Sequence, residues 1–221
     1  MFGIKEMYDL EHTIASDYLE KFTYPWEALA GISEMIKELG KRLPESEYDH
    51  PSENVWIAKD ASVFASAYIN GPCIIGHRTE VRQCAFIRGN ALVGDDCVVG
   101  NSTELKNVIL FDKVQVPHFN YVGDSILGYK AHMGAGSITS NVKSDKRNVV
   151  IKNGRELIPT ERKKVGAMLG DRVEIGCNCV LNPGTVIGAD TNIYPLSSVR
   201  GVIPAMMVYK ACDRIVPKQS V

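Results

Sequence analysis

Aliphatic residues recur every six positions over most of this chain. The spacing shortens to five at two places, is interrupted after Met133, and resumes at Leu169. The aliphatic series is Ile57, Val63, Ile69, Ile75, Val81, Ile87, Val93, Val99, Leu105, Leu110, Val116, Val122, Leu127, Met133, Leu169, Ile175, Leu181, Ile187, Ile193 and Val199. A six-residue period fits neither the 3.6-residue repeat of a helix nor the two-residue repeat of a strand.

This period is the hexapeptide signature of a parallel β-helix. Each hexapeptide supplies one short strand and one corner, so three of them make a triangular coil with the aliphatic side chains stacked inside. A sandwich of ordinary short strands is the alternative, but sandwich strands do not stay in phase over so many repeats. The sequence therefore predicts a mainly β fold built as a solenoid.

Composition limits what else the chain can be. With 221 residues and a net charge of −1, the chain has room for one solenoid and a small accessory segment, and its charge gives no reason to expect nucleic acid binding. No apolar run approaches the roughly 18 residues of a membrane span, and the first residues lack a signal-peptide layout. Cys73, Cys97 and Cys179 occupy the small inward position of the repeat, which favours reduced thiols in a cytoplasmic protein.

Four regions follow from the pattern. Residues 1–54 combine a helical segment with a polar linker, and we expect the helices to cap the open N-terminal end of the solenoid. Residues 55–203 form the β-helix, and residues 204–221 form a tail. A basic excursion at about 139–168 interrupts the β-helix, and Asn153-Gly154 within it predicts a hairpin turn. Long excursions from a solenoid often mark its functional face, although a solvated basic loop is the simpler interpretation.

Two cations lie one coil apart. Arg88 and Lys106 are separated by eighteen residues, so they occupy equivalent positions in adjacent coils, about 4.8 Å apart along the axis. Like charges that close repel each other unless an anion separates them. A phosphate site is one interpretation, and neutralisation by Glu104 or Glu80 is the other.

His118 is the candidate general base. It lies two residues beyond the inward Val116, so its side chain is expected on the outer surface, with aromatic neighbours at Phe119 and Tyr121. An imidazole in such a setting can exchange a proton near neutral pH, whereas a surface histidine without a role is the plain alternative. His132 follows fourteen residues later, in the next coil, where it could share the same cleft.

Two stretches carry a family resemblance. PHFNYVGDSILGYKAHMGAGSITSN, with its H-x-x-Y-x-G-D and G-A-G-S motifs, resembles the acetyltransferase half of the bifunctional glucosamine-1-phosphate N-acetyltransferase / N-acetylglucosamine-1-phosphate uridyltransferase. KKVGAMLGDRVEIGCNCVLNPGTVIG resembles archaeal-type sugar-phosphate nucleotidylyltransferases that carry a left-handed β-helix. The resemblance extends over about residues 24–210.

The resemblance implies a left-handed β-helix, a homotrimer with sites shared between subunits, and acetyl-CoA as co-substrate, with no metal. It makes His118 the catalytic base, and it assigns the sugar phosphate to Arg88 and Lys106. Further roles in binding the amino sugar would fall to Tyr121, His132 and Asn141, and contacts to the coenzyme to Ala135, Cys177 and Pro195. Departures from the family are His132, where asparagine is expected, and the unusual residues at the last two coenzyme positions.

The predicted function is therefore N-acetylation of glucosamine-1-phosphate or galactosamine-1-phosphate, a step of the UDP-N-acetylglucosamine biosynthesis type. No Gly-rich GxGTR-like segment is present, so we do not expect nucleotidyl transfer. A non-catalytic protein that binds a sugar nucleotide or a protein partner is the alternative. A γ-class carbonic anhydrase is disfavoured, because its zinc needs three histidines and no H-x4-H pair occurs here.

Overall fold

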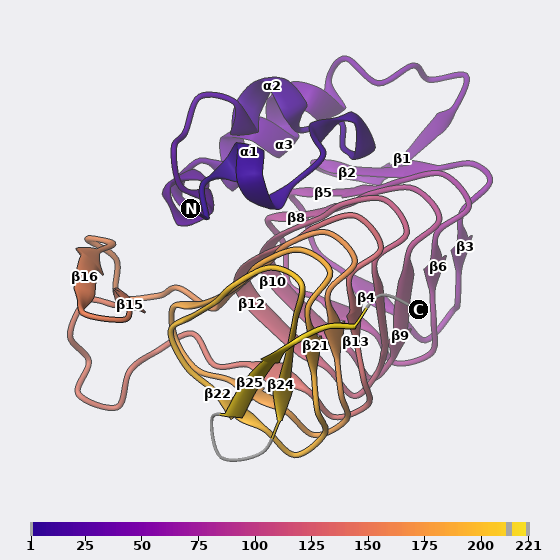
Figure 1. Cartoon of the computed structure of the whole chain (residues 1–221). Helices are drawn as coiled ribbons and strands as arrows, with labels where there is room; N and C mark the ends of the chain where they lie inside the picture. Colours follow the sequence, from indigo (N-terminus) through magenta and orange to yellow (C-terminus); the bar gives the residue numbers. More distant parts are fainter. Residues whose placement is uncertain (1, 211–213, 220–221) are drawn as a thin grey trace.

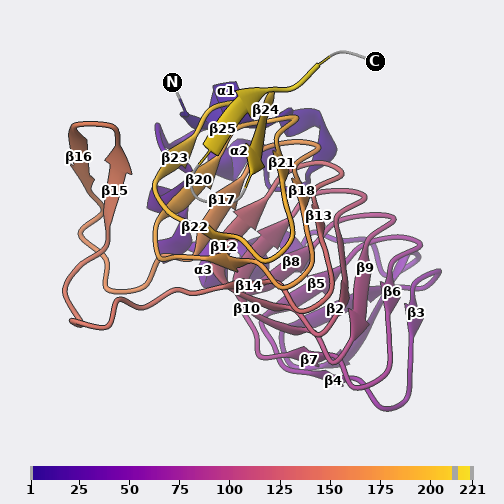
Figure 2. The same ribbon diagram turned by 60° about the horizontal axis from the view of Figure 1, so that its bottom comes forward.

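The computed structural model describes residues 2–210 and 214–219. Short parallel strands wind in stacked turns around one apolar core, as Figures 1 and 2 show. The predicted mainly β solenoid of hexapeptide coils is confirmed. Each turn has three sides, which we call faces 1, 2 and 3 in the order in which the chain runs through them. The left-handed sense comes from the resemblance alone and stays a prediction.

Face 1 consists of β3 (Ser62–Val63), β6 (Glu80–Val81), β9 (Val98–Asn101), β11 (Gln115–His118), β13 (His132–Met133), β18 (Glu174–Ile175), β21 (Asn192–Ile193) and β24 (Met207–Lys210), extended by the antiparallel β25 (Arg214–Pro217). Face 2 consists of β4 (Tyr68–Ile69), β7 (Phe86–Ile87), the first halves of β10 (Glu104–Leu110) and β12 (Tyr121–Leu127), β14 (Ile138–Thr139), β19 (Val180–Leu181) and β22 (Ser198–Val199). Face 3 consists of β2 (Val55–Ala58), β5 (Cys73–Ile75), β8 (Ala91–Val93), the second halves of β10 and β12, β17 (Ala167–Leu169), β20 (Thr185–Ile187) and β23 (Val202–Ile203).

The two shortened repeats lie at one corner. Elsewhere the chain breaks between faces 2 and 3, but β10 and β12 run through that corner without interruption. Val93 pairs with Leu110 and Leu110 with Leu127, so these two turns are one residue shorter than the turn from Ile75 to Val93. The first of these shorter turns carries Lys106, and the second carries Asp124.

The N-terminal segment packs along face 3. It contains α1 (Ile4–Met7), α2 (Ser16–Leu19) and α3 (Ile32–Gly40), with 3-10 turns η1 (Leu10–His12) and η2 (Pro25–Ala30). α3 contacts β5, β8 and β10, and η2 contacts β12, so the helices lie beside the solenoid (Figure 1). Of the helices in the described part of the chain, none combines the length and the apolar character needed to cross a membrane.

These helices were expected to cap the N-terminal end of the solenoid, and the structure instead lays them mainly along face 3. Val63 and Phe64 in the first coil remain 39% and 40% exposed. The helices pack on face 3 because its strands carry three apolar residues in a row, and the middle residue points outward. Ile74, Leu92 and Ile109 are such residues, and each is at most 1% exposed beneath the helices. Covering these side chains removes their apolar surface from water, which stabilises the packing of the helices on face 3.

The linker and the excursion form strands of their own. β1 (Tyr48–Ser52), within the predicted linker, pairs antiparallel with β2 at the edge of face 3. The excursion leaves after β14 and returns at β17, and between them β15 (Val150–Asn153) and β16 (Glu156–Pro159) form the predicted hairpin. Gly154 has a φ of +58° in its turn, and the hairpin projects away from the coils in both views (Figures 1 and 2). Residues 211–213 of the predicted tail lie outside the described residues.

Candidate functional site

His118 belongs to a column at the corner between faces 1 and 2, in which Asn101 precedes it by one coil. Successive turns place Ala135, Cys177 and Pro195 at the equivalent corner position. Backbone hydrogen bonds fix the register, since Gly136 N donates to His118 O (3.0 Å), Asn178 N to Ala135 O (2.8 Å), and Leu196 N to Cys177 O (3.0 Å). The structure therefore aligns the predicted base and the three predicted coenzyme-contacting residues along the solenoid axis.

The imidazole of His118 is exposed. Its backbone N–H donates to Asn120 Oδ1 at 3.1 Å, and the buried Asn120 in turn donates to Gly134 O and Ser137 O. These bonds hold the corner rigid beneath the ring. Within residues 2–210 and 214–219, no side chain forms a hydrogen bond or an ion pair with the ring itself. Both ring nitrogens of His118 are therefore free for a ligand.

Arg88 and Lys106 lie on face 2, in the adjacent coils that the sequence predicted. Arg88 N donates to Leu105 O at 2.9 Å, which sets the two side chains next to each other. Each cation has its own carboxylate. Arg88 Nη1 lies 2.8 Å from Glu104 Oε1, and Lys106 Nζ lies 2.9 Å from Asp124 Oδ1. Neutralisation by Glu104, one of the two interpretations, accounts for Arg88, so an external anion is not required to separate the two charges.

Asp124 is the centre of a buried polar network, which we call the Asp124 network. Its side chain is 3% exposed and accepts from Lys106, from Asn107 Nδ2 at 3.0 Å, and from Asn141 Nδ2 at 2.6 Å. Asn141 Nδ2 also lies 3.2 Å from Tyr121 Oη. Of the predicted acceptor residues, the structure thus joins Lys106, Tyr121 and Asn141 through one carboxylate, and such charge-assisted bonds hold side chains in fixed positions.

Tyr121 links this network to the His118 corner. It begins β12 three residues after His118, and it pairs with Glu104 on β10. Burial raises the pKa of the Tyr121 phenol, and the negative charges of Asp124 and Glu104 raise it further. The phenol therefore keeps its proton at neutral pH. Because Asn141 donates to the Tyr121 oxygen, the O–H remains available to donate to a bound ligand.

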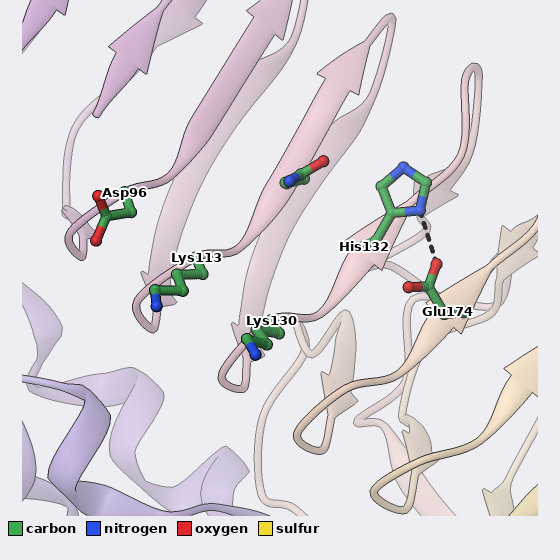
Figure 3. A pocket seen from close by; sticks show the side chains of 6 residues that line it. Asp96, Lys113, Lys130, His132 and Glu174 are labelled. Atoms are coloured by element: carbon green, nitrogen blue, oxygen red, sulfur yellow. Dashed lines mark hydrogen bonds and ion pairs between the residues drawn. The ribbon is translucent and has the colours of Figure 1, made fainter. Parts of the chain in front are cut away.

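His132 lies elsewhere on face 1. It pairs in register with Gln115, three residues before His118 on β11, so the two histidines are about 10 Å apart along the sheet. Its Nδ1 lies 2.8 Å from Glu174 Oε2 (Figure 3). Together with Asp96, Lys113 and Lys130 this pair lines a cavity of about 560 Å³. In the described part of the chain, no hydrogen bond connects His132 to the Asp124 network.

Sequence reasoning missed three contributors to these sites. Asp124 is the last residue of the H-x-x-Y-x-G-D motif and lies eighteen residues after Lys106, a coil spacing that could have revealed the pair. Lys113 and Lys130 share a corner in adjacent shortened turns. Among residues 2–210 and 214–219, no three His, Cys, Asp or Glu side chains gather closely enough to hold a metal ion.

Comparison with known proteins finds one matching family model and several relatives of this chain. Residues 69–155 match the family model described as the GMPPB C-terminal domain. The chain is 33% identical over 141 residues to a bifunctional sugar-1-phosphate nucleotidylyltransferase/acetyltransferase of Sulfurisphaera tokodaii, covering 64% of this chain and 35% of that protein. It is 32% identical over 178 residues to the bifunctional protein GlmU of Methanococcus maripaludis, covering 80% of this chain and 43% of the relative.

The stacked six-residue coils define a hexapeptide-repeat protein. The sequence matches identify the chain further as a homologue of the bifunctional GlmU and sugar-1-phosphate nucleotidylyltransferase/acetyltransferase proteins, as its motifs predicted. The chain spans less than half the length of these two relatives. Among solved structures, the acetyltransferase domain of PglB from Neisseria gonorrhoeae in complex with acetyl coenzyme A is similar at 17% identity and a TM-score of 0.38, covering 74% of this chain and 57% of that one.

Proposed function

We propose that this protein is an acetyl-CoA-dependent N-acetyltransferase that acts on an amino-sugar 1-phosphate of the glucosamine or galactosamine type. The observation that carries the proposal is the corner between faces 1 and 2. There an imidazole with no partner among the described residues is followed in its column by Ala135, Cys177 and Pro195, and the Asp124 network begins three residues further along the chain. The relatives whose names include acetyltransferase activity support the same assignment.

The chemistry requires few groups. The sugar amine attacks the carbonyl carbon of the acetyl thioester, and His118 accepts the proton that the amine loses. The tetrahedral intermediate collapses, the C–S bond breaks, and the imidazolium returns the proton to the departing thiolate. A positioned general base of this kind typically contributes about 10²–10⁴-fold to the rate. No covalent enzyme intermediate forms, so neither of the exposed thiols, Cys84 and Cys177, is needed as a nucleophile.

The acceptor would bind on face 2. Tyr121 can donate its O–H to a sugar hydroxyl, and Asn141 is held beside it by Asp124. Arg88 uses one nitrogen for Glu104 and keeps the other N–H groups of its guanidinium for a ligand. The donor would lie along the column of Ala135, Cys177 and Pro195. A homotrimer would bring a second chain to this corner. His132 of face 1 would then contact the acceptor that is bound to a neighbouring subunit.

Release of free thiol tests the proposal. The protein is incubated with acetyl-CoA and a panel of amino-sugar 1-phosphates, and the same panel is run with His118→Ala. Thiol release that requires one of these sugars and falls with the histidine supports the transferase. If no sugar phosphate of the panel releases thiol, the protein is not this enzyme, and the alternative of a binding protein is favoured.

A further inference from the structure

Two exposed aromatic rings lie together at the first end of face 2. Tyr68 begins β4 and Phe86 begins β7, and the two residues pair in register on strands that are neighbours in Figure 2. Their ring centroids are 5.9 Å apart, with an angle of 56° between the ring planes. Tyr68 is 62% exposed and Phe86 is 39% exposed. Exposed apolar side chains that gather in one patch, unlike those scattered singly, mark a binding surface. We call these two residues the aromatic pair.

The aromatic pair shares a column with the predicted acceptor site. Tyr68 pairs with Phe86, Phe86 with Glu104, and Glu104 with Tyr121, so the four side chains follow one another along the solenoid axis. Tyr121 is predicted to bind the amino sugar. Successive coils are about 4.8 Å apart, which places Phe86 about 10 Å and Tyr68 about 14 Å from Tyr121 along the axis.

The predicted phosphate position lies between the sugar and the aromatic pair. Arg88 follows Phe86 by two residues, and both side chains point outward because Ile87 between them points into the core. Lys106 lies one coil nearer to Tyr121. A ligand with its sugar at Tyr121 and its phosphate at Arg88 and Lys106 therefore directs any group beyond the phosphate toward the two rings.

The surface beyond Arg88 is neutral. Residues 61–72 of the first coil include no charged side chain. A further anionic group would find no cation among these residues, whereas a nucleobase and its ribose carry no charge. Every nucleobase has a π face that stacks on an aromatic ring. The exposed Asn70, two residues after Tyr68, offers both a donor and an acceptor for hydrogen bonds to the base or the ribose.

We propose that the aromatic pair binds the base of a nucleotide-linked amino sugar, so that the acceptor site takes a nucleoside diphosphate sugar more tightly than the free sugar 1-phosphate. This inference rests on the proposed function for the positions of the sugar and the phosphate. The amine lies next to His118 in both ligands, so both are acceptors. The base adds affinity at the far end of the same site.

Calorimetric titrations of the full chain with UDP-glucosamine and with glucosamine-1-phosphate, both without acetyl-CoA, test the role of the rings. The test variants are Tyr68→Ala and Phe86→Ala, and Tyr68→Phe keeps a ring at the same position. The matched control is Phe64→Ala, which removes an exposed ring of the first coil that lies on face 1, outside this column. Gel filtration of each variant measures its oligomeric state.

We expect the wild type to bind UDP-glucosamine more tightly than glucosamine-1-phosphate. Each of the two test variants should weaken UDP-glucosamine binding by about ten- to a hundredfold, the loss typical of one stacked base, and should change glucosamine-1-phosphate binding by less than about threefold. Tyr68→Phe and Phe64→Ala should preserve both affinities. Equal affinity of the wild type for the two ligands, or equal loss of both ligands in the test variants, would overturn the inference. So would a changed oligomeric state of Tyr68→Ala, which would assign the rings to a contact between copies of the chain.

The result is separable from the test of the transferase. Binding of UDP-glucosamine that depends on the rings, without thiol release from any acceptor, would support this site and refute the transferase. Thiol release with glucosamine-1-phosphate, together with unchanged UDP-glucosamine binding in the test variants, would support the transferase and overturn the aromatic site.

Discussion

The two corners that bound face 1 carry different chemistry on the same backbone. At the corner between faces 3 and 1, charged residues stack in successive turns and compensate one another. Arg78 bonds Asp96 at 2.7 Å and Arg172 bonds Asp190 at 2.7 Å, while Lys113 and Lys130 share the ring of Tyr129 between them. At the corner between faces 1 and 2, Asn101 precedes His118 in the same column. From His118 onward the column contains one imidazole followed by the small side chains of Ala135, Cys177 and Pro195.

This difference shows how a repeating fold separates stability from function. Each coil repeats the same register, so a residue at a corner meets its counterparts in the coils above and below. Where opposite charges meet, as in Arg172 and Asp190, the column needs no ligand. Where small residues follow a free imidazole, the column leaves both space and unused hydrogen-bonding groups. The first arrangement fits a structural edge, and the second fits a binding site.

The largest difference in rate is expected between alanine variants of the two histidines of face 1. Replacing His118 with alanine should lower kcat for thiol release by about 10²–10⁴-fold, because the amine loses its proton acceptor. Replacing His132 with alanine should leave kcat within about tenfold, since Glu174 already occupies its Nδ1. Steady-state kinetics with acetyl-CoA and the best amino-sugar phosphate measure both. Equal losses in the two variants would remove the distinction between the two positions.

A bulky residue in the His118 column should affect the donor. Ala135→Leu adds volume next to the proposed path of the thioester, and displacement of the reacting group by about 1 Å can cost about a hundredfold in rate. We expect kcat/KM for acetyl-CoA to fall by about ten- to a hundredfold. Ala65→Leu is the control, because Ala65 is exposed and lies in the first coil, away from the His118 column, whereas Ala135 is half-buried. Unchanged kinetics of Ala135→Leu would place the donor elsewhere.

The smallest effect is expected in the charged column. Arg172→Gln breaks an ion pair whose side chains are 47% and 30% exposed, so the free energy of unfolding should fall by less than about 1 kcal/mol at pH 7. The hydrogen bond from Arg172 lowers the pKa of Asp190. The pair therefore stabilises the fold above the ordinary aspartate pKa of about 3.9, and this contribution is lost as the pH falls through the lowered pKa.

Urea unfolding of wild type and Arg172→Gln at pH 7 and at about pH 3 checks this dependence, with the difference between them shrinking at the lower pH. A difference of several kcal/mol, or one that grows on acidification, would show that the charged column does more than balance surface charge.

Most of the fold could be predicted from the six-residue repeat of the sequence. The six-residue spacing predicted the coils, and the Asn153-Gly154 pair predicted the hairpin of β15 and β16. The position of the helices could also have been predicted, because Ile74, Leu92 and Ile109 are apolar residues at outward positions of face 3. An end cap was expected instead because open ends are a general hazard of solenoids, whereas this apolar face is particular to the chain.

The candidate site could be predicted only in part from the sequence. Coil spacing placed Arg88 beside Lys106, offered Glu104 as a partner of Arg88, and relates Lys106 to Asp124. It does not show that the same carboxylate also bonds Asn107 and Asn141. Asp124 reaches Lys106, Asn107 and Asn141 at once because β12 passes through a shortened corner. Arg162, Lys163 and Lys164 lie some twenty residues from Asn141 in sequence and reach the same corner through the pairing of the excursion's two ends. Contacts of this kind depend on the closed loop and are not visible in a repeat pattern.

Direct identification of the product tests the central claim. Wild-type protein and His118→Ala are incubated with acetyl-CoA and glucosamine-1-phosphate or galactosamine-1-phosphate, and the sugar is recovered and analysed by mass spectrometry and NMR. We predict that the wild type yields a sugar phosphate acetylated at nitrogen and that the variant yields almost none in the same time. Acetylation at oxygen, an equal yield from His118→Ala, or unmodified sugars in every reaction would contradict the account.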